Sequence, residues 1–274
     1  FTALVGMIMA LGGFGENGLH PVLAIAALAL ISVGAGASAA LNMWYDADID
    51  AIMSRTQNRP IPSGRVSKAS ALVFGLWVSG LAVMGMAVMI NYLSAALLVF
   101  TIFFYAVIYT MFLKRATAQN IVIGGAAGAL PPVIGWAAAA NSLSVEPLIY
   151  FAIIFFWTPP HFWALALIKN DDYKAAKVPM LPVTSGVKAT LRQIVGYSIV
   201  LLGVTLLPYT MGFSGLFYAA GASILGLIFV GMCVLLAFSK ADQRNRIAGM
   251  TFVYSIFYLF LLFVLLPADK LVGA

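Results

Sequence analysis

The sequence predicts an all-α membrane protein that crosses the bilayer several times. Three observations support this fold class. Hydrophobic residues make up 63% of the 274 positions and charged residues only 9%, and the mean hydropathy is +1.02. A soluble domain carries roughly 25% charged residues, so this composition excludes a soluble protein. The apolar residues also form eight long runs, and a membrane helix needs about 20 apolar residues.

These runs, in chain order, predict the transmembrane helices. They cover residues 21 to 42, 69 to 90, 93 to 113, 121 to 139, 147 to 169, 191 to 211, 214 to 238 and 249 to 267. A further run, Phe1 to Leu11, is too short to span and lacks the basic flank and cleavage site of a signal peptide. We expect it to be the end of a truncated first helix, which gives about nine transmembrane helices in a single domain over residues 1 to 274.

Two of the runs contain proline pairs, and a third contains the only cysteine. Pro131 and Pro132 are expected to kink the run from 121 to 139. Pro159 and Pro160 are expected to do the same in the run from 147 to 169. The single cysteine, Cys233, excludes a disulfide framework and a Cys-x-x-Cys site, and we expect it to serve in packing.

Basic residues are distributed asymmetrically along the chain. If the spans alternate in direction, the loops at 43 to 68, 114 to 120, 169 to 192 and 239 to 248 share one face. These loops contain all of the 15 basic residues except Lys270. The positive-inside rule makes this face cytoplasmic, or matrix-facing in a mitochondrion. The net charge of +6 is therefore explained by topology, and no nucleic-acid partner is expected.

The strongest functional pattern, NMWYDADID, follows the first long run directly. Its residues Asn42, Asp46 and Asp50 are spaced i, i+4 and i+8, so on a continued helix they share one face, whereas Asp48 points nearly the other way. Carboxylates are unfavourable at the C-terminal end of a helix, so a positive group should compensate. Oxygen ligands without histidine or cysteine suit a hard cation such as Mg²⁺.

Four basic residues on the same side of the membrane complement these carboxylates. Arg55 and Arg59 follow in the same loop, and Lys114 and Arg115 lie in the next cytoplasmic loop. Arginine binds phosphate through paired hydrogen bonds, and Mg²⁺ often takes substrate phosphates as further ligands. The predicted ligand is a diphosphate held between metal and guanidinium groups. The competing interpretation is that these charges are ordinary solvated helix ends, but their density favours a site.

Two long polar loops, about 43 to 68 and 170 to 190, follow spans that run in the same direction. This recurrence is a weak sign of a parallel internal repeat, which secondary transporters also use. Transporter sites lie near the bilayer midplane, whereas these carboxylates lie at the interface beside arginines. An enzyme is therefore favoured, and a transporter remains the alternative from another class.

The Asn-x-x-x-Asp-x-x-x-Asp pattern of NMWYDADID resembles the signature of the UbiA superfamily of intramembrane aromatic prenyltransferases. The segments MSRTQNRPIPSG, WTPPHFWALAL and DYKAAKVPMLPV resemble, in the same order, the branch of that superfamily that farnesylates haem. The resemblance runs from the second span to the last. It implies a ring of helices around a central cavity, with the two polar loops as a cytoplasmic cap.

The resemblance also implies a reaction, in which Mg²⁺ supports transfer of a farnesyl group from farnesyl diphosphate to a vinyl group of haem B. It implies a bacterial inner membrane, with the lipid bilayer around the helices, and a haem A synthase or a terminal oxidase in assembly as protein partner. The implied metal ligands are Asn42, Asp46 and Asp50, and the implied catalytic residues are Asp46, Asp50, Arg55, Arg59 and His161. The implied substrate contacts are Asn42, Arg55, Arg59, Lys114, Arg115, His161, Asp172, Tyr173 and Lys177. A quinone precursor as acceptor is the alternative within the superfamily.

The chain departs from the wider superfamily at the second motif. Most members repeat Asp-x-x-x-Asp there, whereas this chain has adjacent Asp171 and Asp172, so the number of Mg²⁺ ions stays open. His161 follows Pro159 and Pro160 inside a span, where an ionisable residue is a functional candidate. Three roles stay open for it: contact to haem iron, proton transfer near the vinyl group, and a hydrogen bond to a carbonyl that the prolines free.

Overall fold

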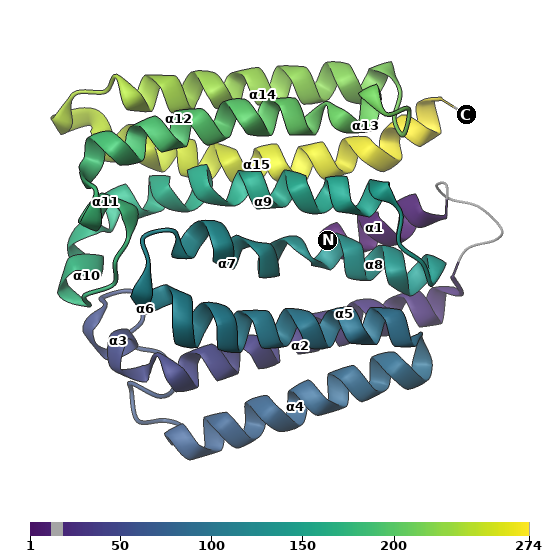
Figure 1. Cartoon of the computed structure of the whole chain (residues 1–274), viewed down its shortest axis with the longest axis horizontal. Helices are drawn as coiled ribbons and strands as arrows, with labels where there is room; N and C mark the ends of the chain where they lie inside the picture. Colours follow the sequence, from purple (N-terminus) through teal and green to yellow (C-terminus); the bar gives the residue numbers. More distant parts are fainter. Residues whose placement is uncertain (12–18, 274) are drawn as a thin grey trace.

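The computed structural model describes residues 1 to 11 and 19 to 273, and within these ranges its regular elements are all helical (Figure 1). The eight helices long enough to span a membrane are α2 (Pro21–Tyr45), α4 (Lys68–Met89), α5 to α6 (Tyr92–Ala116), α7 to α8 (Asn120–Ala140), α9 (Val145–Ile168), α12 to α13 (Gly186–Thr210), α14 (Leu216–Ala237) and α15 (Ala241–Val272). Each corresponds to one predicted apolar run, so the predicted all-α, multi-pass architecture is confirmed.

Three of these spans are built from shorter helices. Their parts are α5 (Tyr92–Phe103), the π-helix η1 (Phe104–Leu113), α6 (Lys114–Ala116), α7 (Asn120–Ala129), α8 (Pro131–Ala140), α12 (Gly186–Thr205) and α13 (Leu207–Thr210). The break between α7 and α8 falls at Leu130, immediately before the proline pair that predicted a kink. Pro159 and Pro160 do not divide α9, which continues as one helix through both.

The N-terminal run forms a short helix, α1 (Thr2–Ala10), that packs on α8 and α15. Glycine makes the contact with α8 close, because a Cβ on Gly6 would collide with the backbone of Pro132, and one on Gly135 with the backbone of Ala3. Small residues at such crossings let two backbones approach within a membrane. α1 is therefore held by backbone proximity at the middle of the bundle.

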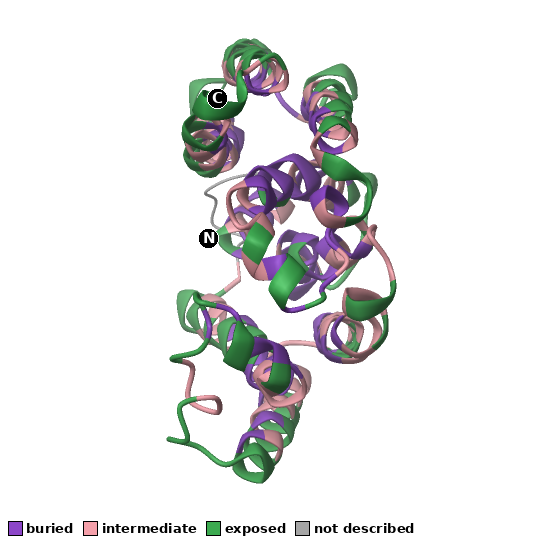
Figure 2. Cartoon of the chain, turned by 90° about the vertical axis from the view of Figure 1, so that its left-hand side faces the viewer, coloured by how far each residue is buried: buried purple, intermediate pink, exposed green. Residues whose placement is uncertain are grey.

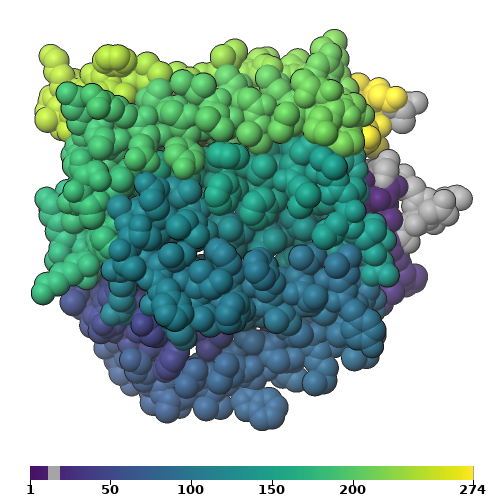
Figure 3. Space-filling view, in the orientation of Figure 1, coloured from purple at the N-terminus to yellow at the C-terminus, as the bar shows by residue number. Residues whose placement is uncertain are grey.

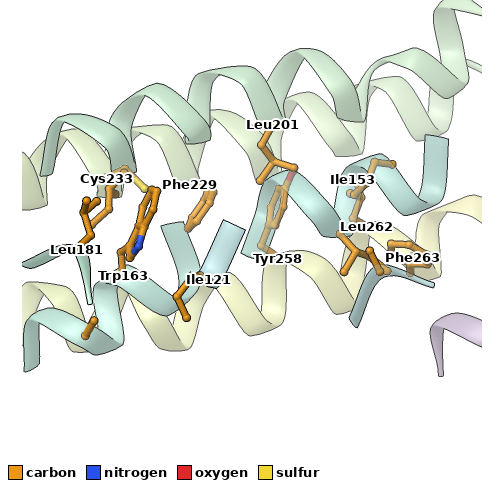
Figure 4. Close-up of a cluster of buried hydrophobic side chains, with 14 of the residues drawn as sticks. Ile121, Ile153, Trp163, Leu181, Leu201, Phe229, Cys233, Tyr258, Leu262 and Phe263 are labelled. Atoms are coloured by element: carbon orange, nitrogen blue, oxygen red, sulfur yellow. The ribbon is translucent and has the colours of Figure 1, made fainter. Parts of the chain in front are cut away.

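Two groups of helices contain the buried apolar side chains. One core is shared by α9, α12, α14 and α15 and includes Trp163, Phe229 and Phe263 (Figure 4). The other is shared by α1, α2, α4, α5 and α8. Viewed from one end, the central helices are mostly buried and the outer faces are mostly exposed (Figure 2). Exposed outer residues such as Trp77 and Val88 are apolar, which suits contact with lipid.

Polar segments gather at one end of the bundle. The first, predicted as a loop from about 43 to 68, contains α3 (Ala47–Ile52), and the second contains α10 (Asn170–Ala175) and α11 (Leu181–Thr184). These short helices lie with α6 at the left of Figure 1, and the space-filling view shows these regions meeting there although they are distant in sequence (Figure 3). The second segment is shorter than predicted because α12 begins at Gly186.

A buried carboxylate fixes the opposite end. Asp269, on α15, accepts hydrogen bonds from two backbone N–H groups. One belongs to Gly215, the residue before α14, and the other to Tyr218, in the first turn of α14. These N–H groups have no partner within their own helix, so the carboxylate serves as a cap supplied from a neighbouring helix. The Tyr218 hydroxyl donates to the Thr205 carbonyl at 2.8 Å. Together these bonds link α12, α14 and α15.

This cap can be tested by substitution of Asp269. Asp269→Ala removes both acceptor oxygens, so the free energy of unfolding should fall by about 1 to 2 kcal/mol. Asp269→Asn keeps one acceptor oxygen, so its free energy of unfolding should lie between those of Asp269→Ala and the wild type. Thermal unfolding of the detergent-solubilised protein measures both effects. Wild-type stability in Asp269→Ala would show that the interhelical cap contributes nothing.

Candidate active site

A cavity of 330 Å³ lies beneath the polar segments, and we call it the main cavity. Both polar segments, α2, η1, α7 and α9 contribute to its wall. Its polar side chains are Asn42, Asp50, Arg55, Arg59, Lys114, Asn120 and Thr158, and its aromatic side chains are Tyr105, Tyr109, Trp157, Phe162 and Tyr173. Charges therefore lie at one end of an otherwise apolar space, an arrangement typical of a site that binds an amphiphilic ligand.

The helical register through the first motif is continuous. The N–H of Asp46 donates to the Asn42 carbonyl at 2.9 Å, and the N–H of Asp50 donates to the Asp46 carbonyl at 2.8 Å. α2 thus passes into α3 with the i, i+4 spacing intact, and all three side chains are buried. The shared face predicted from the spacing is therefore present in the structure.

Asp46 lies at the centre of the charge network. Its carboxylate is fully buried and is paired with Lys114 and with Arg115, whose Nη2 lies 3.2 Å away. Asn42 Nδ2 donates to Asp46 Oδ2 at 2.8 Å and also contacts Thr110 Oγ1 at 3.1 Å. Two cations and an amide thus neutralise a carboxylate that would be strongly unfavourable if buried alone.

Asp50 lines the cavity directly. Its carboxylate is 2% exposed and is paired with Arg59 Nη1 at 2.8 Å. The chain after α3 turns back because the Thr56 hydroxyl donates to the Asp50 carbonyl at 3.0 Å and the Thr56 N–H donates to the Met53 carbonyl at 3.0 Å. This turn carries Arg55 and Arg59 back over the cavity.

Arg55 differs from the other two cations of the cavity wall. Lys114 is paired with Asp46 and Arg59 with Asp50, but Arg55 forms no ion pair within the described residues. Its side chain is exposed and borders the cavity. One guanidinium group is therefore available for an anionic ligand, with two further cations close to it.

The donor set of the first motif fits Mg²⁺. Asn42, Asp46 and Asp50 offer two carboxylates and one amide, all oxygen donors, and the described residues contain no cluster of three or more His, Cys, Asp or Glu. Mg²⁺ usually binds through one or two carboxylates and completes its six ligands with water and substrate phosphate. These residues suit a metal that arrives with a phosphorylated substrate rather than a permanently enclosed ion.

Asp48 points away from this face, as the helix geometry predicts. Its side chain is 62% exposed and receives two hydrogen bonds from Arg115, at 2.7 and 2.8 Å. These bonds lower the pKa of the Asp48 carboxyl to about 2. Arg115 also reaches Asp46 and lies over the Tyr45 ring, so its guanidinium group holds the α2–α3 junction and has little capacity left for a ligand.

Of the predicted site residues in the second polar segment, one lines the main cavity and two do not. Tyr173 lines the cavity, and burial raises the pKa of its phenol. Asp172 instead accepts a hydrogen bond from the Ser54 hydroxyl at 2.7 Å, which links the two polar segments. Lys177 is exposed, adopts a left-handed backbone with φ 54°, and is not among the residues that line the cavity.

His161 is buried between two aromatic rings rather than in the cavity wall. Trp157 and Phe252 stack on its imidazole with centroid separations of 4.2 and 4.5 Å. Its Nδ1 lies 2.6 Å from the Ser255 hydroxyl, which itself donates to the Phe252 carbonyl. The tautomer of His161 determines which of these two groups donates. The contact links α9 to α15.

Several cavity residues were not selected from the sequence. Asn120 is fully buried, lines the cavity and donates to the Thr117 carbonyl at 2.7 Å. Tyr105 and Tyr109 come from η1, where the Thr110 hydroxyl donates to the carbonyl of Tyr105, five residues earlier. π-Helical turns often occur at functional sites. The only sequence signal was polar or aromatic character at the cytoplasmic end of an apolar run, which many membrane helices share.

The helical fold and a cavity with paired carboxylates at one end are the features of an intramembrane enzyme. The family model described as the UbiA prenyltransferase family matches residues 1 to 266, so this chain belongs to the UbiA prenyltransferase family. The chain is 57% identical to a protein named protoheme IX farnesyltransferase from Parvibaculum lavamentivorans, over 100% of this chain and 85% of the relative. It is 55% identical to one of Rhodopseudomonas palustris, over 100% and 86%.

Solved structures support the same fold. The chain matches a digeranylgeranylglyceryl phosphate synthase with a TM-score of 0.78 and 17% identity, over 98% of this chain and 92% of the other. It matches a UbiA homologue from Archaeoglobus fulgidus, solved with DMAPP and Mg²⁺, with a TM-score of 0.67 and 16% identity, over 96% of each chain. At these identities the likeness establishes the helix arrangement alone.

The exposed ion pair of Asp48 should contribute little to stability. Asp48→Asn is expected to lower the free energy of unfolding by less than about 1 kcal/mol at pH 7, because exposed pairs are screened by solvent. The depressed pKa of Asp48 means that this contribution is present above pH 3.8 and is lost as the pH falls towards 2. The stability difference between wild type and Asp48→Asn should therefore vanish over that range.

Thermal unfolding in detergent as a function of pH measures this difference. Asp171→Asn is the matched control, because Asp171 is fully exposed and has only a 4.0 Å contact with Lys174. A loss in Asp48→Asn as large as that in Asp46→Asn would contradict the assignment of Asp48 to the exposed face.

Proposed function

We propose that the protein transfers a farnesyl group from farnesyl diphosphate to a vinyl group of haem B, giving haem O, with Mg²⁺ as cofactor. The observation that supports it most is the charged end of the main cavity, where Asp50, Arg59 and an unpaired Arg55 border an apolar space. The names of the relatives at 55 to 57% identity support the choice of donor and acceptor.

The chain's own residues account for binding of the donor. Arg55 and Arg59 place guanidinium groups where a diphosphate can accept paired hydrogen bonds, and Lys114 adds a third positive charge. Mg²⁺, held by Asn42, Asp46 and Asp50, would neutralise the leaving diphosphate. Asp46 and Asp50 are already buried and held by hydrogen bonds and ion pairs, so the metal-binding side chains are positioned before negative charge develops on the leaving oxygen.

The apolar part of the cavity suits the carbon–carbon bond-forming step. The C1–O bond of farnesyl diphosphate breaks, its electron pair leaves with diphosphate, and the terminal vinyl carbon of haem B attacks the allylic C1. Water then adds to the carbon beside the porphyrin and loses a proton, which completes the hydroxyethylfarnesyl group. Tyr105, Tyr109 and Trp157 exclude water from the allylic cation, and their ring faces can stabilise it by up to about 2 kcal/mol.

The cellular setting follows the charge asymmetry. We place the charged end of the bundle at the cytoplasmic face of a bacterial inner membrane, because the polar segments at this end carry most of the basic residues. The diphosphate would then reach Arg55 from the cytoplasmic side, and the hydrocarbon chain would enter the protein from the bilayer. A haem A synthase or a terminal oxidase in assembly remains the expected consumer of the product.

The carboxylates of the first motif provide the direct test. Asp46→Asn and Asp50→Asn should each reduce conversion of haem B to haem O by at least about 100-fold, because each loses an anionic metal ligand. Asp48→Asn should retain activity within a factor of about 3, because its carboxylate faces solvent. The assay follows haem O by chromatography in membranes supplied with haem B, farnesyl diphosphate and Mg²⁺, and chelation of Mg²⁺ should stop it.

Two outcomes would contradict the proposal in different ways. Undiminished transfer in both Asp46→Asn and Asp50→Asn would refute the metal site. Farnesylation of 4-hydroxybenzoate instead of haem B by the wild-type protein would keep the enzyme class and replace the acceptor with a quinone precursor. Folding of each variant in the membrane is checked by its thermal unfolding, so that loss of activity is not loss of protein.

We propose that His161 has a structural role and holds α9 against α15 through Ser255. Ser255→Ala and His161→Gln should each lower the free energy of unfolding by about 1 kcal/mol. Both should leave the turnover per folded molecule and the absorption spectrum of bound haem unchanged. A shifted haem spectrum in His161→Gln, with a wild-type spectrum in Ser255→Ala, would instead assign His161 to the haem iron.

A further inference from the structure

A second cavity of 250 Å³ adjoins the main cavity, and we call it the side cavity. It lies between α2, α5 and the α7–α8 pair. Its α2 wall is formed by Ile31, Gly34, Ala35, Ser38 and Ala39, of which all but Ile31 are small, and Leu98 and Ile134 lie on its other walls. Leu98 packs directly on Gly34, where a Cβ would meet it at 2.8 Å, so the space lies beside this contact. Gly34 lies two helical turns from Asn42, a depth of about 12 Å below the charged end of the bundle.

Among the described residues, the side cavity offers a ligand no free polar side chain other than the Tyr105 phenol. Its two hydroxyl side chains are already bonded within their own helices, since Ser38 donates to the Gly34 carbonyl at 3.0 Å and Thr101 donates to the Leu97 carbonyl at 2.7 Å. The other lining residues are apolar apart from the Tyr105 phenol at its edge. A hydrocarbon is therefore the ligand chemistry that fits this space, because a polar group placed there would lose its hydrogen bonds to water.

The two cavities meet at Tyr105 and Gly128, which line both of them. Gly128 lies near the end of α7 and is exposed to the open space. A Cβ added at this position would meet no atom within 4 Å. Unlike Gly124 and Gly125, whose added Cβ would meet Tyr109 and Thr158, Gly128 is not required for helix packing. Its missing side chain instead keeps the junction open.

We propose that the side cavity receives the distal isoprene units of the prenyl diphosphate and that Gly128 sets the chain length the site accepts. The proposal rests on the proposed function only in that the donor is a prenyl diphosphate, and it does not depend on the acceptor. The diphosphate binds at Arg55 and Asp50, the chain passes between Tyr105 and Gly128, and its end lies against Gly34 and Leu98. A side chain at position 128 blocks this path for a long chain and leaves the diphosphate site intact.

The test compares three probes on the purified protein in detergent micelles with Mg²⁺: inorganic diphosphate, dimethylallyl thiodiphosphate and farnesyl thiodiphosphate. In Gly128→Leu, the affinity for the farnesyl probe should fall about 10- to 100-fold, while the affinities for the two short probes stay at wild-type values. Gly128→Ala should give a smaller loss with the same selectivity. Gly36→Leu is the control, because Gly36 is an exposed glycine of α2 with open space around its added Cβ and lines neither cavity.

Equal losses for all three probes, or an unchanged affinity for the farnesyl probe in Gly128→Leu, would overturn the proposal. If Gly128→Leu unfolds, Gly128→Ala decides, because it adds one methyl group to open space; unselective binding in that variant is equally contradictory. Failure of the proposed function would give a different result from failure of the chain-length proposal. Selective loss of the farnesyl probe with no haem O from the wild-type protein would reject haem B as acceptor, while haem O formation with equal kcat/KM in wild type and Gly128→Leu would reject only the chain-length proposal.

Discussion

The structure of the site depends on the neutralisation of one buried carboxylate. Asp46 has no solvent contact, and its charge is balanced by Lys114 and Arg115, which follow η1 some seventy residues later in the chain. Breaking such a buried pair by removing one partner typically costs about 3 to 5 kcal/mol. The pairing therefore ties the end of α2 to the end of η1 and fixes the mouth of the main cavity. The turn that carries Arg55 and Arg59 starts from this fixed point.

The balance of charge around Asp46 and Asp50 also determines which groups are free to bind. Arg115 is occupied by Asp46 and Asp48, and Arg59 is bonded to Asp50. Of the three cations in the wall of the main cavity, Arg55 is the one without an ion pair among the described residues, so its charge remains for an anionic ligand. Lys114 and Arg115 are adjacent in sequence but differ in position: Lys114 lines the main cavity, whereas Arg115 supports the junction of α2 and α3.

Much of the fold was predictable because hydropathy and helix geometry act locally. Eight runs gave the eight spans, Pro131 marked the break between α7 and α8, and the i, i+4 spacing separated Asp48 from Asp46 and Asp50. The pairing of Lys114 with Asp46 was not specified in this way, because it joins segments far apart in the chain. The packing of His161 against Ser255 is equally non-local. The two cavities could not be predicted either, because the sequence does not show whether a small residue such as Gly34 or Gly128 packs against a neighbouring helix or lines an open space.

The division of the interior into a charged and an apolar cavity restricts where the reaction can occur. A prenyl diphosphate with its head at Arg55 and its chain in the side cavity would place the C1–O bond close to Tyr105, where the two cavities meet. At this boundary the leaving oxygen faces cations while the carbon it leaves faces aromatic rings, so opposite charges develop in environments suited to each. An enzyme with a uniformly polar cavity would admit water to the allylic carbon, and one with a uniformly apolar cavity could not stabilise the departing diphosphate. If the donor binds as proposed, the junction is therefore the position at which this bond can break without hydrolysis.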